Sequence, residues 1–130
     1  LKLGIEPSVI FMGSRNVMAP GAGAGTYTIA KSGLAQMSRL AAIELSKYNI
    51  RVNTVHPDCV YDTDVWSYKI LKARAKQYGL SVTDYKRRNL LKTDVSSIDV
   101  AELVSFLAST KSSKTTGAQV PIDGGNDRVI

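Results

Sequence analysis

The sequence predicts an α/β fold in which a parallel sheet of three strands is covered by helices on its faces. Short apolar runs rich in β-branched residues alternate along the chain with longer stretches of helical periodicity. Strands that are separated by helices are joined by crossovers, and such strands run parallel. Three strands make a thin sheet with an unpaired edge, so we expect strands from further sequence or from another chain to complete it.

Three apolar runs are the expected strands. The first, residues 8–13, ends in glycine and is short enough to be a buried strand of a parallel sheet. The second, residues 50–55, is rich in β-branched residues, and Pro57 ends it. The third, residues 119–122, is followed by an Asp-Gly-Gly turn.

Helical patterns fill the spaces between these strands. Residues 27–48 carry apolar side chains at three- and four-residue spacing, and small residues widen that apolar surface. We expect this helix to pack on the sheet with one side, and a helix of a second subunit is a candidate partner for the other. A polar insert at about residues 62–92 precedes a further apolar helix. The helices expected here cover residues 65–79, 83–91 and 100–109, the last opened by Asp99.

Composition limits the classes of protein and of partner. The chain has 130 residues, 44% of them hydrophobic and 22% charged, which is typical of a globular domain. No apolar run approaches the ~20 residues that a membrane span requires, and the first residues lack the pattern of a secretory signal. The net charge of +6 is scattered and not interleaved with aromatic residues, which does not favour nucleic-acid binding. A single cysteine, Cys59, fits a reducing compartment such as the cytoplasm.

Three residues suited to acid–base chemistry lie near the first strand. Tyr27 and Lys31 stand four positions apart at the start of the expected helix, which puts both side chains on one face. A nearby cation favours the phenolate form of a tyrosine, so Lys31 would equip Tyr27 to pass a proton to or from an alcohol oxygen. Ser14 follows the first strand, at the end where parallel α/β folds gather their sites, and a Gly/Ala-rich loop separates it from Tyr27.

The order and spacing of these residues resemble the short-chain dehydrogenase/reductase family over essentially the whole chain. The matching segments are residues 9–14 (VIFMGS), 27–33 (YTIAKSG), 50–53 (IRVN) and 116–125 (TGAQVPIDGG). The resemblance implies the C-terminal half of a Rossmann-like, doubly wound parallel sheet, and hydride transfer with NAD or NADP. It also implies that Ser14 bonds the substrate oxygen and that Tyr27 is the acid/base. Lys31 would then support Tyr27 and bind the nicotinamide ribose.

The loop after the second strand resembles the segment that holds nicotinamide in this family. Pro57 and Val60 match residues that contact the carboxamide end, largely through the backbone. Asp58 stands where the family usually has glycine, which limits backbone freedom and adds a charge. Thr63 matches the family's amide-contacting threonine only if one residue is inserted.

The family's glycine-rich phosphate loop and its ribose-selecting residue belong to an N-terminal half that these residues do not match. Residues 21–25 alternate glycine and alanine, but they do not follow a strand with phosphate-binding spacing. We therefore expect residues 1–130 to be the C-terminal catalytic portion of a dehydrogenase domain, inactive alone. Further segments resemble the dehydrogenase portion of bifunctional rhamnulose-1-phosphate aldolase/alcohol dehydrogenases. They are the Pro-Asp pair after Asn53, Trp66, and residues 88–92 (RNLLK) and 112–118 (SSKTTGA).

Other reactive side chains favour structural interpretations. His56 is the single histidine, and no Ser–His–Asp order surrounds it. One histidine and one cysteine do not close a zinc site, so no metal is predicted. Cys59 is interpreted as a small buried residue. Trp66 and Tyr68 either line a substrate pocket or anchor the insert on the core.

The sequence as a whole predicts an NAD- or NADP-dependent oxidoreductase. Its expected partners are a small alcohol, aldehyde or ketone substrate and further copies of itself, with no nucleic acid and no membrane. The rival interpretation is a non-catalytic oligomerisation module derived from such an enzyme, because the helix after Tyr27 and the last strand offer surfaces to a second subunit. The full set of Ser14, Tyr27 and Lys31 favours an enzymatic origin.

Overall fold

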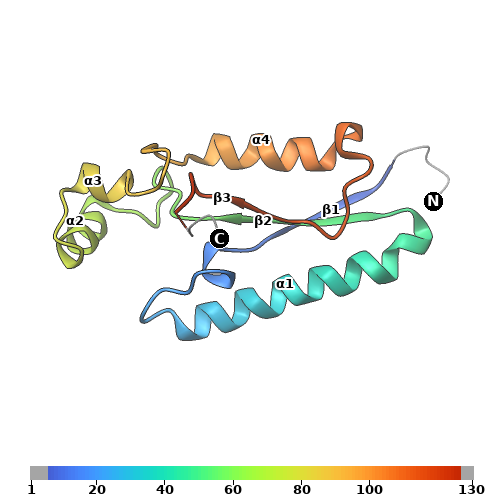
Figure 1. Ribbon diagram of the computed structural model, residues 1–130, viewed down its shortest axis with the longest axis horizontal. Helices are drawn as coiled ribbons and strands as arrows, with labels where there is room; N and C mark the ends of the chain where they lie inside the picture. Colours follow the sequence, from blue (N-terminus) through green and yellow to red (C-terminus); the bar gives the residue numbers. More distant parts are fainter. Residues whose placement is uncertain (1–5, 127–130) are drawn as a thin grey trace.

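A computed structural model describes residues 6–126 as three parallel strands between two layers of helix (Figure 1). β1 (Ser8–Met12) pairs with β2 (Arg51–Pro57), and β2 pairs with β3 (Gln119–Ile122), so that β2 is central. Both pairings are parallel. The arrangement predicted from the alternation of apolar runs and helical patterns is confirmed.

Both faces of β2 are covered by helices (Figure 1). α1 (Gly25–Leu45) lies on one face of the sheet and α4 (Ser97–Ala108) lies on the other. Every residue of β2 up to His56 is consequently buried. The core under α4 is aliphatic and consists of Val55, Val95, Val100 and Leu107.

α1 turns small side chains towards the sheet. Its buried residues are Ala35, Ser38 and Ala42, whose size lets the helix axis approach β2 closely. The helix begins at Gly25, two residues before the predicted start, and passes into a short 3₁₀ turn, η2 (Ser46–Tyr48). Asn49 then takes the left-handed conformation with φ 57°, which ends the helical segment.

α4 begins three residues earlier than the apolar periodicity predicts. Ser96 and Asp99 form a reciprocal capping box at its first turn. The carboxylate of Asp62 also accepts hydrogen bonds from the Ser97 backbone N–H at 2.9 Å and from the Ser97 hydroxyl at 2.6 Å. Polar groups therefore set the start of this helix, ahead of its first apolar residue.

The insert carries two short helices beyond the carboxyl ends of the strands (Figure 1). They are α2 (Tyr68–Gln77) and α3 (Val82–Lys86). The predicted helix over residues 83–91 is wrong beyond Lys86. The amide of Asn89 bonds the Thr93 carbonyl at 2.6 Å and the Thr93 N–H at 3.1 Å, and this side-chain turn competes with helix formation.

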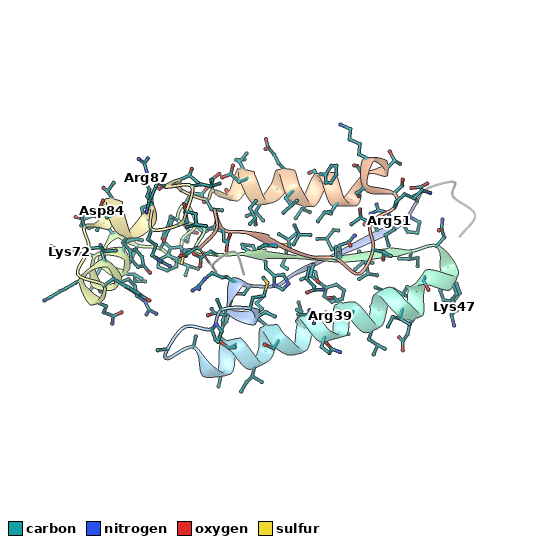
Figure 2. The ribbon with its side chains drawn as sticks, viewed as in Figure 1. Arg39, Lys47, Arg51, Lys72, Asp84 and Arg87 are labelled. Carbon is teal, nitrogen blue, oxygen red and sulfur yellow. The ribbon has the colours of Figure 1, made fainter. Side chains whose placement is uncertain are left out.

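Arg51 lies at the opposite end of the sheet, where α4 ends (Figure 2). Its guanidinium donates to the carbonyl oxygens of Leu107 at 2.7 Å, Ala108 at 3.2 Å and Ser109 at 3.1 Å. These are the carbonyls that a helix leaves unpaired at its C-terminus. Arg51 thus caps α4 and ties it to β2, far from the residues discussed next.

Candidate active site

The carboxyl ends of β1 and β2 open into one cavity of about 780 Å³, here called the strand-end cavity. Its walls come from the loop after β1, the start of α1, the loop after β2 and the insert. The residues that matter below are Ser14, Tyr27, Asp58, Trp66 and Arg88. Two of the three predicted catalytic residues, Ser14 and Tyr27, therefore lie on one cavity although a loop separates them in sequence.

Ser14 is held rigidly at the mouth of β1. It is 6% exposed, and its hydroxyl oxygen accepts a hydrogen bond from the Asn16 N–H at 3.2 Å, which caps the short helix η1 (Arg15–Val17). Its backbone N–H points at Nδ1 of His56, 3.1 Å away. The hydroxyl proton of Ser14 has no acceptor among the described residues and is available to a ligand oxygen in the cavity.

Tyr27 and Lys31 occupy the first two turns of α1, as their spacing predicts. The Tyr27 side chain is about half exposed, and the Lys31 ammonium lies 5.9 Å from the centre of its ring. Lys31 Nζ donates to the carbonyl oxygen of Met12 at 2.8 Å. That bond fixes the ammonium between the end of β1 and Tyr27, and it uses one of the three ammonium protons.

The predicted nicotinamide contacts lie beside the cavity rather than on its wall. Pro57 is the last residue of β2. Val60 is half-buried against the aliphatic core under α4, and its carbonyl accepts the Thr63 hydroxyl at 2.8 Å. The backbone N–H of Val60 donates to no atom of residues 6–126, so it remains open to a ligand acceptor.

Asp58 connects four segments at this edge of the sheet. Its carboxylate accepts from Arg15 Nε at 2.8 Å, lies 3.6 Å from a guanidinium nitrogen of Arg88, and also accepts from the Asn126 side-chain amide. Only about a tenth of the Asp58 side chain is exposed, which strengthens these contacts relative to a surface pair. Asp58 was recognisable in the sequence as a departure from glycine, but its partners were not predicted.

An aromatic cluster holds the insert together. Trp66 packs edge-on against Tyr61 with ring centres 5.3 Å apart, and the Arg88 guanidinium lies 4.3 Å from the ring centre of Tyr85. Trp66 lines the strand-end cavity and packs within the insert's own hydrophobic cluster. Its lining of a substrate pocket stays a prediction. Tyr68 is 70% exposed and does not line the cavity.

Burial changes the acidity of the side chains around this cluster. Burial raises the pKa of the Cys59 thiol, and the Asp58 carboxylate raises it further. Burial likewise raises the pKa values of Tyr61 and Tyr85 above the ordinary range. Cys59 is therefore a protonated thiol at neutral pH. It is only half-buried and lines the strand-end cavity, which differs from the predicted buried position.

Residues 6–126 contain neither a candidate metal site nor a candidate membrane-spanning helix. No group of three or more His, Cys, Asp or Glu side chains is arranged to hold a metal ion within this part of the chain. No helix in the same residues is both long enough and apolar enough to cross a membrane.

Comparison with known proteins gives matches along nearly the whole chain. The family model described as enoyl-(acyl carrier protein) reductase, of the short-chain dehydrogenase type, matches residues 3–127. The uncharacterized oxidoreductase YuxG of Bacillus subtilis (strain 168) is 34% identical over 123 residues, which are 91% of this chain and 18% of YuxG. The 3-oxoacyl-[acyl-carrier-protein] reductase MabA of Mycobacterium bovis is 36% identical over 117 residues, 90% of this chain and 44% of MabA.

Solved structures agree with the sequence matches. A short chain dehydrogenase family protein from Francisella tularensis subsp. tularensis SCHU S4 superposes with a TM-score of 0.78 at 36% identity. The alignment covers 93% of this chain and 51% of that protein. The chain thus spans from 18% to about half of the length of these relatives.

Proposed function

Because this chain belongs to the short-chain dehydrogenase/reductase family, we propose that it is the catalytic portion of a nicotinamide-dependent oxidoreductase. The proposed reaction interconverts an alcohol with an aldehyde or ketone. The observation that carries this proposal is the meeting of Ser14 and Tyr27 on the strand-end cavity, with the Lys31 ammonium beside the tyrosine ring. The single cysteine fits a reducing compartment, and we propose that the enzyme is cytoplasmic.

The donors present suit NAD or NADP. Lys31 keeps two ammonium protons for the ribose hydroxyls after bonding Met12, and the Val60 N–H is open for the carboxamide beside Pro57. When bound, the nicotinamide supplies or accepts the hydride. The dinucleotide's phosphates would need the further sequence that the relatives have, so we propose that this chain alone does not turn over substrate.

The chain's own residues would handle the proton. The Ser14 hydroxyl, whose oxygen is already bonded by the Asn16 N–H, can donate to the substrate oxygen and orient it. Tyr27 Oη can then give its proton to that oxygen during reduction or remove it during oxidation. The nearby Lys31 cation stabilises the phenolate that results, because opposite charges at short range favour the ionised form.

Replacing Tyr27 tests this assignment. In the polypeptide encoded by the complete reading frame, Tyr27→Phe should lower kcat by about 10² or more, because it removes a general acid. Cofactor affinity, followed by NADH fluorescence, should be unchanged. Tyr48→Phe is the matched control, since Tyr48 is exposed at the far end of α1. Turnover retained by Tyr27→Phe would contradict the role of Tyr27.

The length of one relative supports a more specific origin. The matched stretch is 44% of MabA but 18% of YuxG, so YuxG is more than twice as long. Together with the motif resemblance, this supports the proposal that the chain derives from a bifunctional rhamnulose-1-phosphate aldolase/alcohol dehydrogenase. Sequencing the gene upstream of Leu1 tests it. We expect a strand followed by a glycine-rich loop, preceded by an aldolase domain, and a reading frame that starts near Leu1 would contradict the proposal.

A second candidate function, a non-catalytic oligomerisation module, is favoured by the outer face of α1. Ile29, Met37, Leu40 and Ile43 follow helical spacing there and are 53–73% exposed. Apolar stripes of this kind mark interfaces more often than free surface. The same face would also serve a homo-oligomeric enzyme.

Light scattering of the purified chain tests the α1 interface. We expect an oligomer that Ile43→Lys dissociates, because a charge on the stripe opposes its burial. Ile98→Lys on α4, at a similarly exposed isoleucine, should leave the assembly intact. A monomeric chain, or equal effects of both variants, would exclude this interface.

A further inference from the structure

A chain of hydrogen-bonded polar side chains, all buried except the half-buried Gln119, runs from α1 across the sheet to Ser14. Its members are Ser38 on α1, Thr54 and His56 on β2, and Gln119 on β3. Ser38 is 1% exposed, and Thr54 and His56 are fully buried. Buried polar groups are stable only if each finds a partner, so the positions of their protons can be worked out by counting.

The two hydroxyl protons are fixed first. The Ser38 hydroxyl donates to the Ala35 carbonyl at 2.7 Å, and the Thr54 hydroxyl donates to Ser38 Oγ at 2.6 Å. Neither hydroxyl has a second proton to give. Gln119 must therefore present its NH₂ group to both, at 3.0 Å and 3.2 Å, which turns its Oε1 towards His56.

The orientation of Gln119 fixes the tautomer of His56. Gln119 Oε1 lies 2.8 Å from His56 Nε2 and can only accept, so Nε2 carries the proton. Nδ1 is then an unprotonated acceptor for the Ser14 backbone N–H, 3.1 Å away, and it makes no hydrogen bond to the Ser14 carbonyl oxygen that lies 3.0 Å from it. The opposite tautomer would gain one hydrogen bond, from Nδ1–H to the Ser14 carbonyl oxygen at 3.0 Å. It would lose two, because the Nε2 lone pair would face the Gln119 oxygen and the Ser14 N–H would face a second proton.

We propose that His56 and Gln119 are positioning residues that hold Ser14 in register with the helix that carries Tyr27 and Lys31. Ser38 belongs to that helix, and Ser14 lies at the other end of the chain of hydrogen bonds. The fully buried imidazole does not touch substrate. It is linked through Gln119 on β3 to Ser38 on α1, so the position of α1 determines the position of the Ser14 backbone. This inference rests on the proposed function in so far as Ser14 acts on substrate.

Nitrogen-15 NMR of the unmodified chain tests the proton order. His56 is the only histidine, so both ring nitrogens are assigned without mutagenesis. In the neutral imidazole, we expect a protonated Nε2, an unprotonated Nδ1, and a scalar coupling between Nδ1 and the Ser14 N–H. A protonated Nδ1, or no such coupling, would overturn the proposed network.

Matched variants of the complete polypeptide test the positioning role. Gln119→Leu should lower kcat about tenfold or more by displacing Ser14, while the KM for cofactor is unchanged. Gln36→Leu, the same change on the exposed side of α1, should have no effect. His56→Asn offers an acceptor, Oδ1, near the position of Nδ1. It should therefore retain a higher kcat than His56→Leu, whose side chain has no acceptor.

The two proposals fail in different ways. An enzyme in which Tyr27→Phe is inactive while Gln119→Leu and His56→Leu turn over normally refutes the positioning role alone. An enzyme with no hydride transfer refutes the proposed function, whereas the NMR result would still stand as a statement about Ser14 and His56.

Discussion

At the scale of single residues, the missing side chain of Gly13 leaves room for His56 at the carboxyl ends of the strands. A Cβ atom built on Gly13 would lie 2.4 Å from His56 Nδ1 and 3.0 Å from Thr54 Cγ2. Both neighbours are fully buried and have no space to retreat. The imidazole reaches the Ser14 N–H only because the residue before Ser14 is glycine.

Two glycine substitutions should have opposite effects on stability. Gly13→Ala should lower the free energy of unfolding by about 1–3 kcal/mol through overpacking. Gly33→Ala should raise it by about 0.5–1 kcal/mol, because Gly33 lies within α1 with no atom near its missing Cβ. Urea unfolding measures both. A Gly13→Ala chain as stable as wild type would show that the close approach to His56 is not constraining.

At this scale, contacts between residues close in sequence were predictable, and contacts between distant residues were not. Tyr27 and Lys31 could be paired because helical spacing brings them together locally, and their catalytic roles stay predictions. The bonds of His56 reach Ser14, 42 positions away, and Gln119, 63 positions away. No local pattern encodes such contacts, so His56 was assigned only a structural role and Gln119 none.

At the scale of elements, the carboxylates of Asp62 and Asp99 stabilise the first turn of α4. Hydrogen bonds from Ser97 lower the pKa of Asp62, and hydrogen bonds from Ser96 lower the pKa of Asp99. The Ser-x-x-Asp signal was present in the sequence. The periodicity of apolar residues predicted a start of α4 that was too late. Ile98, the apolar residue that precedes Val100 in the first turn, is exposed.

Acid should loosen the start of α4 selectively. A carboxylate with a lowered pKa stabilises the fold above its unfolded-state pKa, and this stability is lost as the pH falls through the lowered folded value. We therefore expect hydrogen exchange at Ser97 and Val100 to accelerate severalfold, relative to intrinsic rates, as the pH falls below about 4. The first turn of α1 is the internal control, since it has no side-chain cap and no acidic residue. Equal acceleration in both helices would contradict the prediction.

At the scale of the whole molecule, the order of elements was predictable and the placement of the insert was not. Strand–helix alternation determines a parallel sheet with covered faces, because crossover connections leave few alternatives. The insert is held by contacts between distant residues: Arg88 with Asp58 and Tyr61, and Leu91 N–H with the Gly124 carbonyl at 3.1 Å.

Removing the charge of Asp58 should weaken this attachment. Asp58→Asn leaves two partly buried arginines, Arg15 and Arg88, without their carboxylate, and should lower the free energy of unfolding by about 2 kcal/mol. Asp94→Asn is the control, because Asp94 pairs with Lys86 and Arg87 at a more exposed site and should cost less than about 1 kcal/mol. Guanidinium denaturation measures both. Equal losses would mean that the burial of the Asp58 contacts adds nothing.

The four-way contact at Asp58 also has a consequence for motion. Arg15 follows β1, Asp58 follows β2, Arg88 follows α3 and Asn126 follows β3, and all converge on one carboxylate. Segments that share an anchor cannot fluctuate separately, so the mouth of the strand-end cavity should undergo local unfolding as one cooperative unit. A ligand that stabilised any of the four segments would then damp the opening of the other three.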